Sequence, residues 1–131
     1  MASITTGQTL VGENLIRTRE NIPRNILLYE VSGPFFFGAA ERATSALRGT
    51  ATQIRAIIFL MENVPAMDMT GLVAFESAVK ELSARGAQVH VVGLREQPAE
   101  LLKKSEVLKK FQIGTHTSLD EAIRIAKANH S

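Results

Sequence analysis

The chain has no cysteine, and this absence removes several classes of site. Without thiols there is no disulfide framework, no thiolate metal site and no cysteine nucleophile. The 131-residue chain must therefore be stabilised by burial of apolar side chains. A chain of this size can bury about two thirds of its unfolded surface. A chain without cysteine also fits a reducing compartment.

Long apolar runs are missing as well. The run from Ala56 to Met61 is six residues long, whereas a membrane-spanning helix needs about 20. The first 25 residues contain no continuous apolar stretch of the kind that a secretory signal has. From the sequence we therefore expect no membrane insertion by this chain.

Net charge is small. Fifteen basic and 13 acidic residues give +2, which is too little to predict a nucleic-acid partner. The basic residues within 95–110 are interleaved with acidic ones, so a solvated helix face explains them better than a phosphate-binding patch. With 45% hydrophobic and 21% charged residues, the composition is that of one globular domain.

Hydrophobic patterning predicts an α/β domain over residues 25–128, after a flexible N-terminal arm or linker at 1–24 and before a tail at 129–131. The expected order is ββαβαβα(β)α, with strands at 26–31, 35–37, 55–61, 88–92 and 111–113, and helices at 39–47, 69–85, 98–105 and from 119. Such alternation predicts a mostly parallel sheet flanked by helices. The opening hairpin would add an antiparallel edge.

Two helices carry clear local signals. The helix at 69–85 has a core-facing stripe and ends before Gly86, a typical left-handed cap: Leu72, Phe75, Val79 and Leu82 form the stripe. Ser118 and Glu121 have the spacing of a capping box that opens the last helix. On that helix, Leu119, Ala122, Ile123 and Ala126 are expected to face inward.

Signatures of catalysis are mostly absent. The chain has no Gly-x-x-x-x-Gly-Lys-Ser/Thr loop, no Gly-x-Gly-x-x-Gly loop and no Gly-x-Ser-x-Gly nucleophile elbow. Its histidines, His90, His116 and His130, lack metal-ligand spacing. We expect His90 to be a satisfied side chain within a strand and His116 to make local hydrogen bonds. No catalytic residue, metal or cofactor is predicted.

The most informative stretch joins the strand at 55–61 to the helix at 69–85. Asp68 is placed to cap the helix with its carboxylate, and Thr70 would lie in the first turn with its hydroxyl near solvent. One interpretation is that Asp68 caps and Thr70 is merely tolerated. The other is that Thr70 is a phosphorylation site, because added negative charge would be favoured by the helix dipole and repelled by Asp68.

These residues carry a resemblance. The motif Asp68-Met69-Thr70-Gly71-Leu72, between a buried strand and an amphipathic helix, resembles the STAS domain pattern Asp-Ser/Ala-Ser/Thr-Gly-Leu. That domain is shared by anti-sigma-factor antagonists and by the cytoplasmic tails of SulP-type anion transporters, and the resemblance spans about 25–127. In the antagonists a partner kinase phosphorylates the second hydroxyl position, which is Thr70 here. Met69 departs from the commoner small residue.

A second stretch favours the transporter branch. Residues 32–41 resemble the Gly-Pro-Leu-Phe-Phe-Gly-x-Ala-Glu signature of transporter tails. Adjacent Phe35, Phe36 and Phe37 cannot all point inward from a strand. Either at least one of them is partly exposed, or covered by the N-terminal arm or by a partner, or a local irregularity buries all three. We expect the helix starts after Gly38 and at Asp68 to share one edge of the sheet and to offer N–H groups to a partner.

The resemblance implies a non-catalytic, regulatory interaction domain of a bacterial SulP-family anion (sulfate) transporter. The domain would lie at the cytoplasmic face of the inner membrane as part of a longer membrane protein. Its expected partner or anion surface is Asp68, Met69, Thr70, Gly71, Phe36, Phe37 and Gly38. Implied partners are the membrane portion of its transporter and a cytoplasmic protein such as acyl carrier protein. Nucleotide binding is also implied, although the sequence carries no nucleotide motif.

Two other functions stay open. The first is a soluble cytoplasmic anti-sigma-factor antagonist that phosphorylation of Thr70 would switch. The second is a small-molecule-binding domain or weak hydrolase, which would need a deep pocket with a base near a nucleophile.

Overall fold

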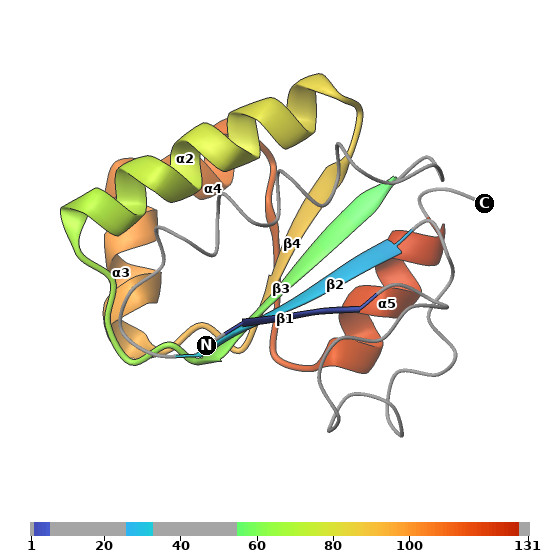
Figure 1. Ribbon diagram of the computed structural model, residues 1–131, viewed down its shortest axis with the longest axis horizontal. Coiled ribbons are helices and arrows are strands. Elements are labelled where there is room, and N and C mark those ends of the chain that lie inside the picture. The colour runs from blue at the N-terminus through green and yellow to red at the C-terminus, as the bar shows by residue number, and fades with distance from the viewer. Residues whose placement is uncertain (1, 6–25, 33–54, 129–131) are drawn as a thin grey trace.

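A single sheet with strand order β1-β2-β3-β4-β5 organises the computed structural model, which describes residues 2–5, 26–32 and 55–128 (Figure 1). The strands are β1 (Ala2–Thr5), β2 (Ile26–Ser32), β3 (Ala56–Asn63), β4 (Gln88–Val92) and β5 (Gly114–His116). The helices are α2 (Met69–Ala84), α3 (Glu96–Ser105), α4 (Val107–Lys110) and α5 (Leu119–Ala128).

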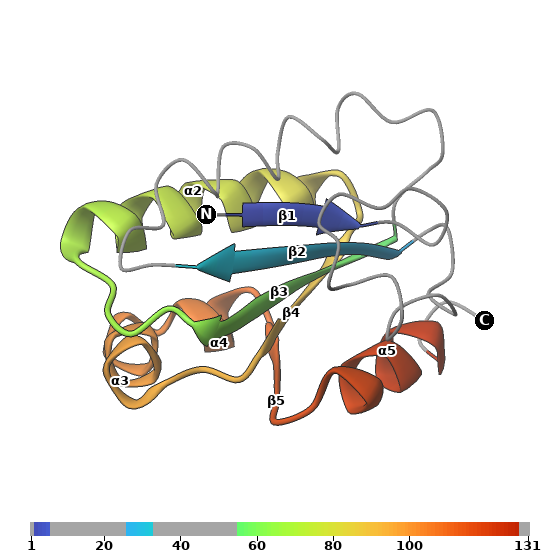
Figure 2. The same cartoon turned by 60° about the horizontal axis from the view of Figure 1, so that its bottom comes forward.

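Four of the five strands in the described residues run parallel. β2, β3, β4 and β5 pair parallel in that order, and β1 pairs antiparallel with β2 at the edge (Figure 2). The predicted α/β class with a mostly parallel sheet is confirmed. The described antiparallel edge comes from Ala2–Thr5, where the sequence predicted no strand. The expected strand at 35–37 and helix at 39–47 lie outside the described residues, and the domain limits of 25–128 stay a prediction.

β3 is covered on both faces. Its first six residues, Ala56 to Met61, are all buried, as the unbroken apolar run predicted. Alternate side chains point to opposite faces, so Phe59 packs with the residues of α2 while Ile58 packs with those of α5. Figure 1 shows the same division, with α2, α3 and α4 on one side of the sheet and α5 on the other.

The α2 side of the sheet holds an aromatic cluster. The Phe59 and Phe75 rings meet edge to face with centroids 5.7 Å apart, and Tyr29 stacks on Phe59 at 6.0 Å. Such pairs add about 0.5–1.5 kcal/mol each beyond their buried area. The predicted stripe of α2 is buried in full: Leu72, Phe75, Val79 and Leu82. The predicted left-handed residue after α2 is also confirmed, since Gly86 has φ of +87°.

α5 packs closely on the other face through small side chains. Ala122 and Ala126 are fully buried, while Leu119 and Ile123 are partly buried against the same cluster. One half of the predicted capping box is present, because the Glu121 N–H donates to Ser118 Oγ at 3.2 Å. The Glu121 carboxylate instead contacts His116.

The predicted strand at 111–113 is wrong. Gln112 has φ of +53°, a left-handed conformation outside that of a regular strand, and the Ile113 N–H donates back to the Leu108 carbonyl at 2.8 Å. These residues therefore close α4, and pairing with β4 starts only at Gly114. The helix expected from residue 98 starts two residues earlier, which leaves Pro98 in the first turn, where its missing N–H costs little.

Candidate functional site

The loop from β3 to α2 leaves the sheet at the carboxyl ends of the parallel strands and passes beside α3 (Figure 1). It begins with a turn in which the Val64 N–H donates to the Met61 carbonyl at 3.0 Å. Val64 and Met67 are buried, whereas Pro65, Ala66 and Asp68 are exposed. The apolar side chains of the loop therefore hold it down, and its other residues face outward.

Asp68 caps α2, as predicted. Its backbone is extended, with φ −96° and ψ −179°, and its Oδ1 accepts a hydrogen bond from the Gly71 N–H at 2.7 Å. The carboxylate satisfies one of the free N–H groups of the first turn and lies at the positive end of the helix dipole. Its bond with Gly71 fixes the direction in which the helix starts.

An exposed apolar pair lies at this helix start. Met69 is 63% exposed and Val73 is 58% exposed. In the part of the chain that the structure describes, these two are the large hydrophobic residues that are exposed to solvent. Residues four apart lie on the same side of a helix, so Met69 and Val73 are neighbours. Thr70 is exposed beside them, as predicted. We define the α2-start surface as Asp68, Met69, Thr70 and Val73.

The structure revises the predicted surface at two residues. Gly71 is buried, so it supports the surface through its N–H instead of forming part of it. Val73 was missed, although the signal was present: it is an apolar residue that falls off the stripe made by Leu72 and Phe75. The other predicted surface residues, Phe36, Phe37 and Gly38, lie outside the described residues, and so does the expected helix start after Gly38.

Gln97 on α3 holds the loop through a pair of hydrogen bonds. Its Oε1 accepts from the Met67 N–H at 2.7 Å, and its Nε2 donates to the Met67 carbonyl at 3.0 Å. The side-chain amide thus satisfies both backbone groups of the residue that precedes Asp68. Nothing in the sequence signals this contact, because the two residues are 30 positions apart.

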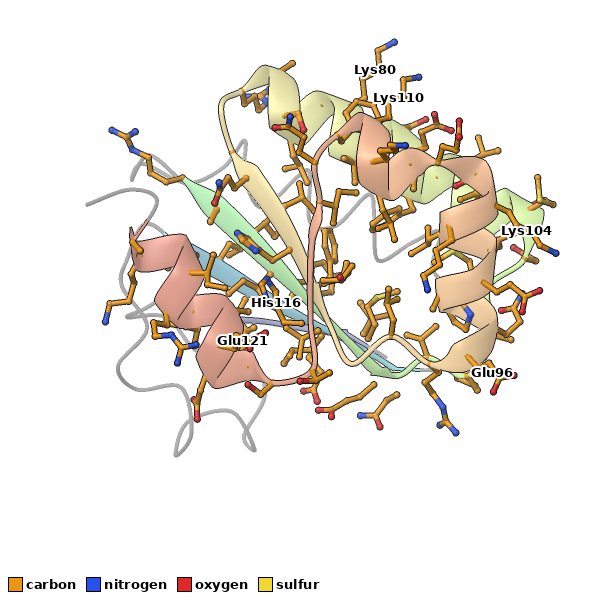
Figure 3. All side chains as sticks on the ribbon, turned by 180° about the vertical axis from the view of Figure 1, so that it is seen from behind. Lys80, Glu96, Lys104, Lys110, His116 and Glu121 are labelled. Atoms are coloured by element: carbon orange, nitrogen blue, oxygen red, sulfur yellow. The ribbon has the colours of Figure 1, made fainter. Side chains whose placement is uncertain are left out.

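Gln97 also borders an open hollow of about 350 Å³ along α3. The hollow is lined by Glu96, Gln97, Glu100, Leu101 and Lys104. Figure 3 shows Glu96 near one end of α3 and Lys104 farther along the helix. The basic residues of this region are solvated and partly paired, as the sequence indicated: Lys104 Nζ lies 3.2 Å from Glu100, and Lys110 Nζ lies 3.8 Å from Glu76.

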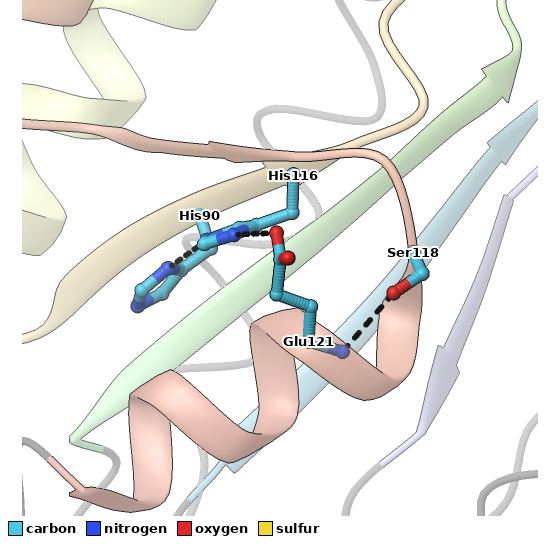
Figure 4. Close-up of polar contacts among 4 residues, drawn as sticks. All are labelled: His90, His116, Ser118 and Glu121. Atoms are coloured by element: carbon cyan, nitrogen blue, oxygen red, sulfur yellow. Dashed lines mark hydrogen bonds and ion pairs between the residues drawn. The ribbon is translucent and has the colours of Figure 1, made fainter.

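A polar chain lies on the α5 side of the sheet (Figure 4). His90 Nδ1 and His116 Nε2 are 3.0 Å apart, and His116 Nδ1 is 3.1 Å from Glu121 Oε1. His90 Nε2 is 3.0 Å from Gln88 Oε1. His90 is 3% exposed and the His116 side chain is 6% exposed, so the prediction of a satisfied histidine within a strand is confirmed for His90.

The hydrogen bonds from the two histidine rings to Gln88 and Glu121 show which ring nitrogens carry a proton. Carboxylate and amide oxygens only accept, so His116 donates to Glu121 and His90 donates to Gln88. The arrangement also requires Gly114, because a Cβ there would lie 2.7 Å from His90 Nδ1.

Two features are not found among the described residues, a metal-binding group and a membrane-spanning helix. Over the described residues, no three His, Asp or Glu side chains are grouped so that they could hold a metal ion. Within the same ranges, no helix combines the length and the apolar character that a bilayer crossing needs. The histidines tie β4, β5 and α5 to one another.

Comparison with known proteins identifies relatives of this protein. A family model described as "STAS domain" matches residues 16–122. The bicarbonate transporter BicA of Synechocystis is 32% identical over 84 residues, which cover 64% of this chain and 15% of that transporter. The chain thus corresponds to a small part of this curated relative.

Solved structures of a STAS domain and of an anti-sigma factor antagonist have a similar fold. The SulP transporter STAS domain from Vibrio cholerae superposes with a TM-score of 0.74 at 26% identity, over 88% of this chain and 91% of that one. The anti-sigma factor antagonist SpoIIAA, in its unphosphorylated form, superposes with a TM-score of 0.56 at 17% identity, over 82% and 93%. The second likeness extends the fold, and the fold alone, to the antagonists.

Proposed function

The chain belongs to the STAS domain family and is related to the STAS domains of SulP-family transporters, and we propose that it is the non-catalytic regulatory domain of a bacterial SulP-family anion transporter. In this proposal the domain lies at the cytoplasmic face of the inner membrane as part of a longer polypeptide. It contacts the membrane portion of its own transporter through the α2-start surface, and a cytoplasmic protein such as acyl carrier protein is a further candidate partner.

The observation that carries this proposal is the exposed apolar pair at the start of α2. Met69 and Val73 expose most of their side chains to water on a helix whose opposite face is buried. Exposed apolar side chains that adjoin one another favour contact with another protein surface. The cap made by Asp68 and the Gln97 clamp hold the backbone beneath them, so the surface is ordered before a partner arrives. The proposed surface extends to Phe36, Phe37 and Gly38, which lie outside the described residues.

The transporter proposal has a direct test in uptake. Full-length transporter that contains this chain is reconstituted in vesicles, and uptake of labelled sulfate and bicarbonate is measured for a Met69→Asp, Val73→Asp double variant. If these two side chains are among the interface residues whose loss costs more than about 1 kcal/mol, a factor of about five in binding, the variant should lower uptake about fivefold or more. Ser77→Asp, an exposed position one turn along α2, is the matched control and should leave uptake unchanged.

Two results would contradict the proposal. Equal uptake by the double variant and the control would show that the α2-start surface does not regulate transport. A genomic reading frame that encodes no hydrophobic region joined to this chain would show that the chain is not part of a transporter.

The second candidate is a cytoplasmic anti-sigma-factor antagonist, favoured by the exposure of Thr70 in the first turn of α2. Phosphate on Thr70 would sit at the positive end of the helix and beside the Asp68 carboxylate, so it would change the charge of the docking surface. Incubation with a cognate kinase and ATP, followed by mass spectrometry, tests this function. Stoichiometric phosphate on Thr70 that abolishes partner binding would support the antagonist, and an unmodified Thr70 would exclude it.

A further inference from the structure

The side chain of Gln97 joins α3 to the loop preceding the α2-start surface. The Met67 N–H, bonded to Gln97 Oε1 at 2.7 Å, and the Met67 carbonyl, bonded to Gln97 Nε2 at 3.0 Å, belong to the residue directly before Asp68. A primary amide offers one acceptor and two donors, which is the pattern that a backbone N–H and carbonyl require. The contact therefore requires a side chain that carries both an acceptor and a donor, and a side chain with only one of them does not suffice.

The position of Met67 lets this contact influence the start of α2. The Met67 side chain is 2% exposed and belongs to the core on the α2 face of the sheet, so it sets the depth of the loop. Gln97 fixes the orientation of the Met67 peptide groups, and the next residue is the cap of α2. Rotation of these peptide groups would move Asp68 relative to the Gly71 N–H and would redirect the first turn, which carries Thr70.

We infer that Gln97 is the positioning residue of the α2-start surface: through its amide, α3 sets the conformation in which Asp68, Met69 and Thr70 are presented. This inference rests on the proposed function for its biological meaning, but not for its physical test. A surface held in its binding conformation pays less ordering entropy when a partner binds. Loss of the amide should therefore weaken docking without removing any docking residue.

The test compares two variants in the 131-residue chain. Gln97→Met keeps the reach of the side chain and removes all its polar atoms. Hydrogen exchange at the Met67 amide should therefore accelerate about 2- to 10-fold, the factor that corresponds to the loss of one hydrogen bond. The NMR amide signals of Asp68, Met69 and Gly71 should shift. Glu100→Gln, a change one turn farther along the same helix at a residue that pairs with Lys104, is the control and should leave these signals in place.

Gln97→Glu separates a positioning role from a merely structural one. At neutral pH the introduced carboxylate accepts from the Met67 N–H but repels the Met67 carbonyl, so the loop signals should differ from those of the wild type. A protonated carboxyl has a donor and an acceptor, as the amide does. Acidification to about pH 4, near the ordinary titration of a glutamate, should therefore move the signals back toward those of the wild type at the same pH. The shifts caused by Gln97→Met should remain.

Each outcome discriminates. Loop signals that are unchanged in both Gln97 variants, or that fail to recover on acidification of Gln97→Glu, would overturn the inference. If the loop responds as expected but Gln97→Met in the full-length transporter leaves uptake unchanged, the positioning role stands and the proposed function of the surface fails. If Gln97→Met also lowers uptake while Glu100→Gln does not, both hold.

Discussion

The two faces of the sheet are held by different chemistry. On the α2 face, three aromatic rings, Tyr29, Phe59 and Phe75, pack in sequence across β2, β3 and α2. On the α5 face, buried alanines lie beside a chain of hydrogen bonds that runs from His90 through His116 to Glu121. The comparison indicates that the first face depends on packed volume, while the second depends on geometry between polar atoms.

The largest expected effect comes from breaking the aromatic cluster. Phe75→Ala removes a fully buried ring from the centre of the α2 face, and such truncations lower the free energy of unfolding by about 3–5 kcal/mol. Urea denaturation measures this change. The matched change on the other face is Ile123→Ala, which truncates a partly buried side chain and should cost clearly less. Equal losses would contradict the contrast between the two faces.

A smaller but more specific effect is expected from Gly114→Ala. The added methyl group would lie 2.7 Å from His90 Nδ1 and 2.9 Å from His116 Nε2, so the two rings must separate and lose their mutual hydrogen bond. Forced repacking and a buried unsatisfied nitrogen together should cost about 1–3 kcal/mol. Urea denaturation gives the stability, and ¹⁵N signals of the imidazole rings report the loss of the bond.

Gly86→Ala is the control for that experiment. A Cβ at Gly86 meets nothing within 4 Å, so the variant carries only the strain of a left-handed backbone, about 1 kcal/mol. It should leave the histidine signals unchanged. Unchanged histidine signals in Gly114→Ala as well would show that the polar chain does not depend on the glycine.

The sequence predicted the α2 face better than the α5 face, and the reason is the range of the signals. The stripe of α2, its Asp68 cap and its Gly86 terminus are local patterns, and each is confirmed. The polar chain joins β4 to β5 and α5 across 26 residues and then five, and its pairing depends on where β5 starts. Placing that strand at 111–113 hid the partnership, because Gly114 is the residue that pairs with His90.

The candidate site shows the same division. Spacing alone predicted that Asp68 caps α2 and that Thr70 is exposed. It did not predict Val73, because the stripe was used to find the buried side of the helix and not the apolar residues left outside it. The Gln97 clamp was beyond sequence reasoning, since a glutamine on an exposed helix has no preference for a particular distant peptide group.

The smallest expected effects compare the caps of the two helices. Asp68→Ala should lower the free energy of unfolding by about 1 kcal/mol, because the carboxylate makes a short 2.7 Å bond to the Gly71 N–H and opposes the helix dipole.

Ser118→Ala should cost less, about 0.5 kcal/mol, because its bond to the Glu121 N–H is 3.2 Å long and exposed, and a hydroxyl carries no charge. Asp68→Asn keeps the acceptor and removes the charge, so urea denaturation of all three variants separates the hydrogen bond of the α2 cap from its dipole contribution. If Asp68→Asn is as stable as the wild type, geometry alone makes the α2 cap the stronger one. If Asp68→Asn is only as stable as Asp68→Ala, the charge of the carboxylate makes the α2 cap the stronger one.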